Sequence, residues 1–82
     1  MQEYKPISCE YYDYIEHYAV KGEIITIEFM DDYSFISTIQ DVILDTHIKD
    51  KEEFIILKSG KRIRMDHVIR LNDYILSDYP SC

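Results

Sequence analysis

A chain of 82 residues is long enough for one small domain and too short for a deep enzyme cleft with a second module. Its composition, 46% hydrophobic and 30% charged, is that of an ordinary globular protein. It contains no apolar run near the roughly 20 residues that span a membrane. The net charge of −7 argues against nucleic acid as the main partner, because phosphate binding depends on Lys and Arg. A basic protein partner is the better expectation, and the alternative is that the negative charge only aids solubility.

The two cysteines, Cys9 and Cys82, lie near opposite ends of the chain. A secreted domain of this size usually carries a larger set of cysteines that form a disulfide framework. The first residues also lack the basic and then apolar segments of a secretory signal. We therefore expect two free thiols and a cytoplasmic protein.

The first predicted element is a helix over about residues 8–21. Residues 1–7 are expected to be extended, because Pro6 disfavours helix at Lys5. Ser8 is a suitable N-cap for the helix, and Gly22 is a typical C-terminal stop.

This helix is expected to have two different faces, since each residue turns by about 100°. The face that packs on the rest of the domain is predicted to combine Tyr12, Ile15 and Ala19, flanked by Tyr11 and Tyr18. The exposed face is predicted to carry carboxylates and a tyrosine, namely Glu10, Asp13 and Tyr14, with Glu16 at its boundary. Negative charges among aromatic rings resemble the phosphates and bases of single-stranded nucleic acid, so this face is the main candidate for partner binding. The alternative is an ordinary solvated helix face.

From residue 23 onward the hydrophobic period changes to two, which indicates β-strands. We expect five strands, over residues 23–29, 34–44, 53–58, 61–65 and 68–71. The expected turns are at 30–33 and 59–60, and residues 45–52 form the most polar loop. One helix followed by five short strands is typical of a mainly β fold, a small five-stranded Sm-like or SH3-like barrel over residues 23–71. Residues 72–82 are the expected C-terminal tail, and residues 1–82 form a single domain.

No group of residues in the sequence points to catalysis or to a cofactor. The side chains that most often ligate zinc are widely spaced, without a CxxC or HxxxH pair, at Cys9, His17, His47, His67 and Cys82. There is no glycine-rich phosphate loop, because the chain contains only two glycines. We expect no enzyme activity, no catalytic residue, no metal site and no cofactor.

The segment Lys58–Arg70 carries five basic residues and one aspartate, whereas residues 1–16 carry four carboxylates and one lysine. An alternative function is therefore an Sm-like RNA-binding protein that uses this basic hairpin. The simpler interpretation is that these side chains are solvated or paired with the acidic surface.

The motif Y-x-P-I-S-C-E-x-Y-D-x-I-E over residues 4–16 resembles the N-terminal signature of the Rho-binding antiterminator family (Rof). The order of the later elements, a helix and then Sm-like strands, extends the resemblance to about residue 71. It implies a small cytoplasmic bacterial protein with an Sm-like barrel and an added N-terminal helix. Family members bind the primary RNA-binding site on the N-terminal OB-fold domain of the hexameric transcription termination factor Rho. They block RNA loading and so inhibit Rho-dependent termination, which gives antitermination.

The resemblance also implies which residues bind. The positions that match the family's contacts are Tyr12, Asp13 and Glu16, and helix geometry adds Glu10. A polar loop of the family also reaches Rho, and its counterpart here contains Lys49, Asp50 and Lys51, which differ from the family in detail. The expected partner is therefore Rho, without direct binding of nucleic acid or membrane, and the free protein is expected to be a monomer.

Overall fold

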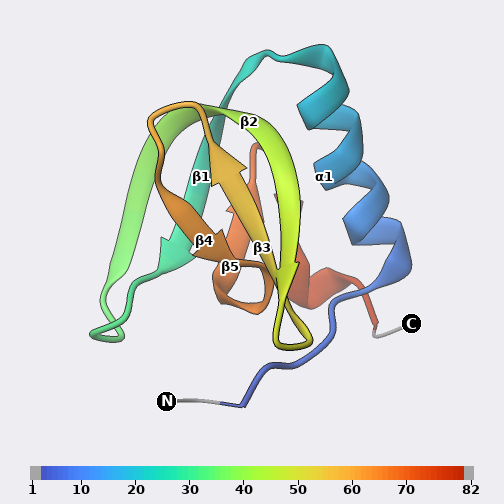
Figure 1. Cartoon of the computed structure of the whole chain (residues 1–82), viewed down its shortest axis with the longest axis vertical. Coiled ribbons are helices and arrows are strands. Elements are labelled where there is room, and N and C mark those ends of the chain that lie inside the picture. The colour runs from blue at the N-terminus through green and yellow to red at the C-terminus, as the bar shows by residue number, and fades with distance from the viewer. Residues whose placement is uncertain (1–2, 81–82) are drawn as a thin grey trace.

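The computed structural model describes residues 3–80 and consists of one helix followed by an antiparallel sheet (Figure 1). The elements are α1 (Cys9–Lys21), β1 (Ile24–Met30), β2 (Ile36–Lys49), β3 (Glu52–Leu57), β4 (Arg62–Arg64), the 3-10 helix η1 (Met65–His67), β5 (Val68–Leu71), β6 (Tyr74–Ile75) and the 3-10 helix η2 (Leu76–Asp78). A mainly β fold with one N-terminal helix is thus confirmed. In this part of the chain, no helix is both long and apolar enough to cross a membrane.

The helix follows its predicted boundaries because both ends are capped. The Glu10 N–H donates to the Ser8 hydroxyl oxygen at 3.1 Å, which satisfies one of the free donors of the first turn. At the other end Gly22 has φ of 65° and donates its N–H to the Tyr18 carbonyl at 3.0 Å. A left-handed glycine in this position is a common helix stop.

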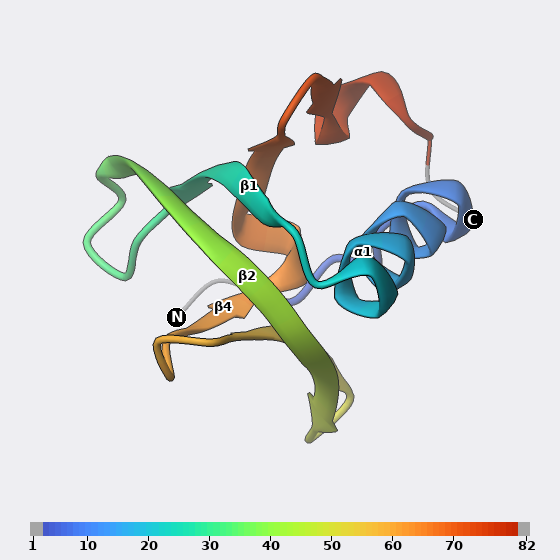
Figure 2. The same cartoon turned by 90° about the horizontal axis from the view of Figure 1, so that it is seen from above.

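The six strands form one sheet in the order β4-β3-β2-β1-β5-β6. The long strand β2 joins its two halves, because residues 36–42 pair with β1 and residues 43–49 pair with β3. Figures 1 and 2 show β2 as a single bent strand that crosses the molecule, with α1 beside the sheet. A register shift between Ile43 and Asp45 marks a β-bulge at Leu44, and a bulge bends the strand that carries it.

The prediction of a closed five-stranded barrel is wrong in two respects. The sheet has a sixth strand, and β4 and β6, at its two ends, do not pair with each other within residues 3–80. The sixth strand arises in the expected tail, where Tyr74–Ile75 pairs with Arg70–Leu71. The short β4 leads directly into η1, so only three residues are available for pairing at that end.

Residues 45–52 are expected to form a polar loop at a hairpin tip. The hairpin is confirmed, but the length of the loop is wrong. Strand β2 continues to Lys49, and only Asp50 and Lys51 form the turn before β3. Both turn residues have positive φ, 53° and 67°, which is the conformation of a two-residue type I′ hairpin. A polar sequence is compatible with this strand because its alternate side chains face solvent.

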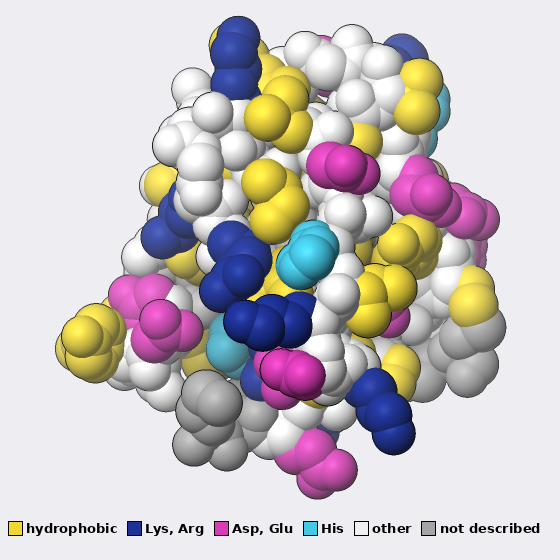
Figure 3. Space-filling view, in the orientation of Figure 1, with side chains coloured by type: hydrophobic (Ala, Val, Ile, Leu, Met, Phe, Trp, Pro, Cys, Tyr) yellow, Lys and Arg dark blue, Asp and Glu magenta, His cyan; other side chains and the backbone are white. Residues whose placement is uncertain are grey.

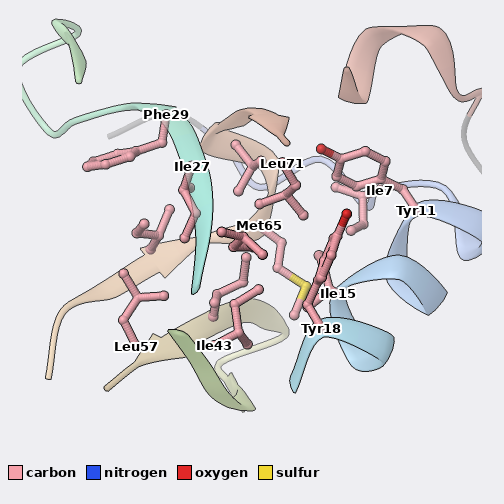
Figure 4. Close-up of a cluster of buried hydrophobic side chains, with 14 residues drawn as sticks. Ile7, Tyr11, Ile15, Tyr18, Ile27, Phe29, Ile43, Leu57, Met65 and Leu71 are labelled. Carbon is pink, nitrogen blue, oxygen red and sulfur yellow. The ribbon is translucent and has the colours of Figure 1, made fainter. Parts of the chain in front are cut away.

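The core lies between α1 and the concave side of the sheet (Figure 4). In Figure 4 the side chains of Ile15 and Tyr18 point from α1 toward Met65. The fully buried side chains come from the helix, four strands and η1: Tyr11, Ile15, Ile25, Ile27, Ile43, Ile55, Leu57, Met65 and Leu71. The buried stripe of α1 is therefore centred on Tyr11, Ile15 and Tyr18, whereas Tyr12 and Ala19 are half-buried.

The C-terminal segment explains this rotation of the buried stripe. The Tyr11 hydroxyl donates to the Tyr74 carbonyl at 2.8 Å, and the Tyr14 ring stacks on the Tyr74 ring with centroids 4.1 Å apart. Tyr14 is half-buried as a result, and its predicted exposure is wrong. The apolar residues at 74–76 indicate that the tail packs on the domain, but they do not reveal that β6 and η2 lie against the start of the helix.

The prediction of two free thiols is wrong at Cys9, which is disulfide-bonded. The prediction for Cys82 falls outside the described residues. Two cysteines far apart in the sequence predicted free thiols. Their spacing does not reveal which parts of the chain meet at the start of α1. The C-terminal segment meets the helix there, with the Tyr79 ring 5.3 Å from the Tyr11 ring.

Candidate protein-binding surface

The outer face of α1 carries three exposed carboxylates, Glu10, Asp13 and Glu16. Their spacing of three residues places them in one row along the helix. The opposite face of the helix is buried and both of its ends are capped. The carboxylates are therefore presented on a rigid element, and little conformational entropy has to be lost when a partner binds.

Tyr12 lies between this acidic row and the sheet. Its ring is half-buried against the core, and its hydroxyl shares a hydrogen bond with the Thr46 hydroxyl of β2 at 3.3 Å. Tyr12 as a whole is partly exposed, on the same helix as the exposed Asp13 and Glu16. Tyr12 is the aromatic residue among the predicted contact residues, and the fold leaves it partly accessible.

The neighbouring tyrosines pack within the protein. Tyr11 is completely buried, and its ring lies 5.3 Å from that of Tyr79. Tyr14 stacks on Tyr74 and meets Tyr79 edge to face at 5.7 Å. A hydrogen bond with the Tyr14 side chain raises the pKa of Tyr79 to about 12. Tyr11 and Tyr14 therefore belong to the internal packing of the protein and do not widen the aromatic part of the contact face.

The remaining predicted residues, Lys49, Asp50 and Lys51, lie at the tip of the β2–β3 hairpin and are exposed. The structure does not bring them onto the helix. Strand β2 connects the two places, because Thr46 touches α1 and Lys49 follows three residues later, about 10 Å along an extended strand. The helix face and the hairpin tip are therefore two separate parts of the surface.

A groove of about 970 Å³, called here the large groove, separates the hairpin tip from the β1–β2 turn. It contains most of the predicted basic hairpin, but its charges are balanced. Four Lys or Arg side chains and four carboxylates line it: Lys49, Lys61, Arg62, Arg64, Asp31, Asp32, Asp50 and Glu52. Figure 3 shows Lys and Arg side chains interspersed with His, Asp and Glu on this face. A balanced groove is a weak binder of phosphates.

Arg64 is one basic residue of the large groove whose charge is already paired within the protein. Its side chain is almost buried, and its Nε and one terminal nitrogen donate to Asp66 at 2.6 and 2.8 Å. Glu52 lies 3.7 Å from another terminal nitrogen. The hydrogen bond with Asp66 raises the pKa of Arg64 further. Next to it, Arg62 lies over the Phe54 ring at 4.8 Å and so packs against its own sheet.

A second and smaller groove of about 220 Å³ lies between α1 and β2. This α1–β2 groove is lined by Glu16, Ala19, Val20, Leu44, Asp45 and Thr46. Sequence reasoning found Glu16 but missed Leu44 and Asp45, which were placed in the end of a strand and the start of a loop. A leucine next to an aspartate was the only available signal, and it does not reveal the β-bulge that lets both residues line a groove beside the helix.

Within residues 3–80 no three His, Cys, Asp or Glu side chains gather in a way that suits a metal ion. The exposed carboxylates of α1 instead form a row along a convex helix, which suits contact with a basic surface. Comparisons with protein-family models, curated proteins and solved structures returned no match to this chain.

Proposed function

We propose that this chain is a protein inhibitor of transcription termination factor Rho. Its helix α1 binds the primary RNA-binding site on the OB-fold domain of Rho, excludes RNA and gives antitermination, without catalysis. The observation that carries this proposal is the row of exposed carboxylates, Glu10, Asp13 and Glu16, on a helix that is capped at both ends.

The chemistry of the two surfaces supports the proposal. An OB-fold that binds single-stranded RNA has a basic groove with aromatic stacking platforms. The carboxylate row of α1 complements such a groove in charge, and the partly exposed Tyr12 supplies an aromatic ring beside it. In this proposal Lys49, Asp50 and Lys51 at the hairpin tip form a second contact with Rho, separate from the helix.

The order of the strands is the second line of support. The run β4-β3-β2-β1-β5, with the short helix η1 between β4 and β5, follows the order of an Sm-like sheet. We propose that the fold is related to that class, with the added strand β6 and an open edge as departures. A monomeric free protein belongs to the same proposal. A cytoplasmic bacterial location is proposed from the resemblance alone, because the disulfide at Cys9 removes the argument from free thiols.

Charge reversal on the helix tests the contact face. Asp13→Arg and Glu16→Lys are each expected to weaken binding to Rho by about 2–5 kcal/mol, because a partner cation is left facing a like charge. Binding would be measured by isothermal titration calorimetry with purified Rho. Asp32→Arg, an exposed aspartate in the β1–β2 turn, is the matched control, and circular dichroism verifies that each variant is folded. Binding of both helix variants at wild-type strength would show that α1 is not the contact face.

Displacement of RNA tests the mechanism. A labelled C-rich RNA bound to Rho is titrated with the protein, and fluorescence anisotropy reports the bound RNA. We expect anisotropy to fall to the value of free RNA. A parallel titration without Rho detects direct RNA binding by the Lys58–Arg70 hairpin, which the balanced charge of the large groove disfavours. If RNA stays bound to Rho and the protein binds RNA in the titration without Rho, the inhibitor proposal is wrong. The RNA-binding function then takes its place.

A further inference from the structure

The α1–β2 groove borders the proposed Rho contact and has a composition that suits one kind of side chain. Its walls are apolar, from Ala19, Val20 and Leu44, and Glu16 and Asp45 supply two carboxylates. We propose that this groove receives one Lys or Arg side chain of the Rho RNA-binding domain, with its aliphatic stem on the apolar wall and its charged end between the two carboxylates. This inference rests on the proposed function and adds Leu44 and Asp45 to the contact.

The size of the groove limits what it can hold. Its volume of about 220 Å³ is below the range of roughly 300–1,000 Å³ that is usual for small-molecule pockets. A single extended side chain is a better match than a cofactor or a nucleotide. Lys and Arg bury their methylene stems along apolar surface while the charged end stays at the rim, which corresponds to the arrangement of wall and carboxylates here.

A β-bulge creates this arrangement. In a regular strand neighbouring side chains point to opposite faces, so Leu44 and Asp45 would not line one groove. The register of β2 on β3 shifts between Ile43 and Asp45, and Leu44 is the extra residue. The bulge allows Leu44 and Asp45 to line the same groove. Thr46 follows Asp45 in regular register and lines the groove from the other face of the strand, where its hydroxyl meets Tyr12. Bulges occur preferentially where a side chain has to be redirected toward a site.

Two apolar residues of the groove and its two carboxylates are exposed in the structure of residues 3–80. Val20 is 88% exposed and Leu44 is 56% exposed. Neither Glu16 nor Asp45 belongs to an ion pair in the described part of the chain. Asp45 accepts the Thr46 N–H with its Oδ1 at 2.8 Å, so its second oxygen is available for a cation. A basic side chain would neutralise both carboxylates and cover the apolar wall.

Four single substitutions, measured as dissociation constants for Rho, test the proposal. Asp45→Asn keeps the oxygen that accepts from Thr46 but removes the charge, and we expect binding to weaken roughly tenfold. Leu44→Gln removes the apolar wall and is expected to weaken binding severalfold. The matched controls are Asp32→Asn and Ile36→Gln, an exposed aspartate and an exposed aliphatic residue outside the groove. Both controls should bind as the wild type does.

A double-mutant cycle tests whether one cation meets both carboxylates. If it does, Glu16→Gln and Asp45→Asn together should weaken binding by less than the product of the two single effects. Multiplicative effects would overturn the shared cation.

The outcomes separate this inference from the proposed function. If Asp13→Arg prevents binding but Asp45→Asn and Leu44→Gln behave like their controls, the groove is not part of the contact, and the inhibitor proposal still stands. If the wild-type protein does not bind Rho at all, both proposals fail.

Discussion

Lys51 has a conformation that costs energy for any residue with a Cβ atom. Its φ is 67°, and that of the preceding Asp50 is 53°, both in the left-handed region. The turn between β2 and β3 requires these values because a two-residue hairpin follows the twist of its strands only in the type I′ form. The preferred sequence for this turn ends in glycine, so the protein tolerates strain at Lys51.

Lys51→Gly is therefore expected to stabilise the protein by roughly 0.5–1 kcal/mol, because relief of the left-handed strain outweighs the greater freedom of glycine in the unfolded chain. Urea denaturation followed by circular dichroism measures the change. Lys49→Gly is the control, since Lys49 is the last residue of an extended strand and should lose a similar amount. Equal destabilisation by both variants would contradict the type I′ assignment.

At the scale of the element, α1 depends on its caps as much as on its packing. Ser8 is 6% exposed and accepts the N–H of Glu10 at 3.1 Å. The carboxylate of Glu10 lies in the first turn, where it interacts favourably with the helix dipole. These local interactions fix where the helix begins, and they hold the acidic row in place relative to the sheet.

Removal of the N-cap should weaken this element. Ser8→Ala is expected to lower the free energy of unfolding by about 1 kcal/mol, since the N–H of Glu10 loses its acceptor. Urea denaturation again gives the value. Ser77→Ala, at an exposed serine of η2, should change stability by less than about 0.5 kcal/mol. An unchanged unfolding midpoint for Ser8→Ala would show that the cap does not contribute to the folded state.

At the scale of the whole molecule, tyrosines from distant parts of the sequence tie the termini to the core. Four of the eight tyrosines, Tyr4, Tyr11, Tyr18 and Tyr79, have a pKa raised above the ordinary value of 10.0. Burial is the main cause at Tyr4, Tyr11 and Tyr18, and the hydrogen bond with Tyr14 is the main cause at Tyr79. Folding therefore favours the neutral form of these phenols.

The protein should consequently lose stability at alkaline pH. A pKa that is higher in the folded state means that the contribution is complete below pH 10.0, the unfolded value, and is lost as the pH rises through the folded values. Ultraviolet absorbance of tyrosinate, recorded against pH for the native protein, should show a group of tyrosines that ionises late. The chain in urea is the reference, and overlapping native and unfolded curves would contradict the burial of these rings.

Much of the molecule could be predicted from local patterns. The helix boundaries follow from Ser8 and Gly22, and the exposure of Glu10, Asp13 and Glu16 follows from the helical period. The mainly β character of the rest follows from the period of two. These features depend on interactions within a few residues, which composition and spacing record directly.

Other features were decided only when distant segments met. The open edge of the sheet, the sixth strand and the stacking of Tyr14 on Tyr74 all depend on where the C-terminal segment packs. The β-bulge that lets Leu44 and Asp45 line the α1–β2 groove depends on the register of β2 on β3. Register and burial are set by the total packing of the core, which no short stretch of sequence contains. The sequence by itself therefore determined the acidic helix, and the tertiary structure determined the surface that surrounds it.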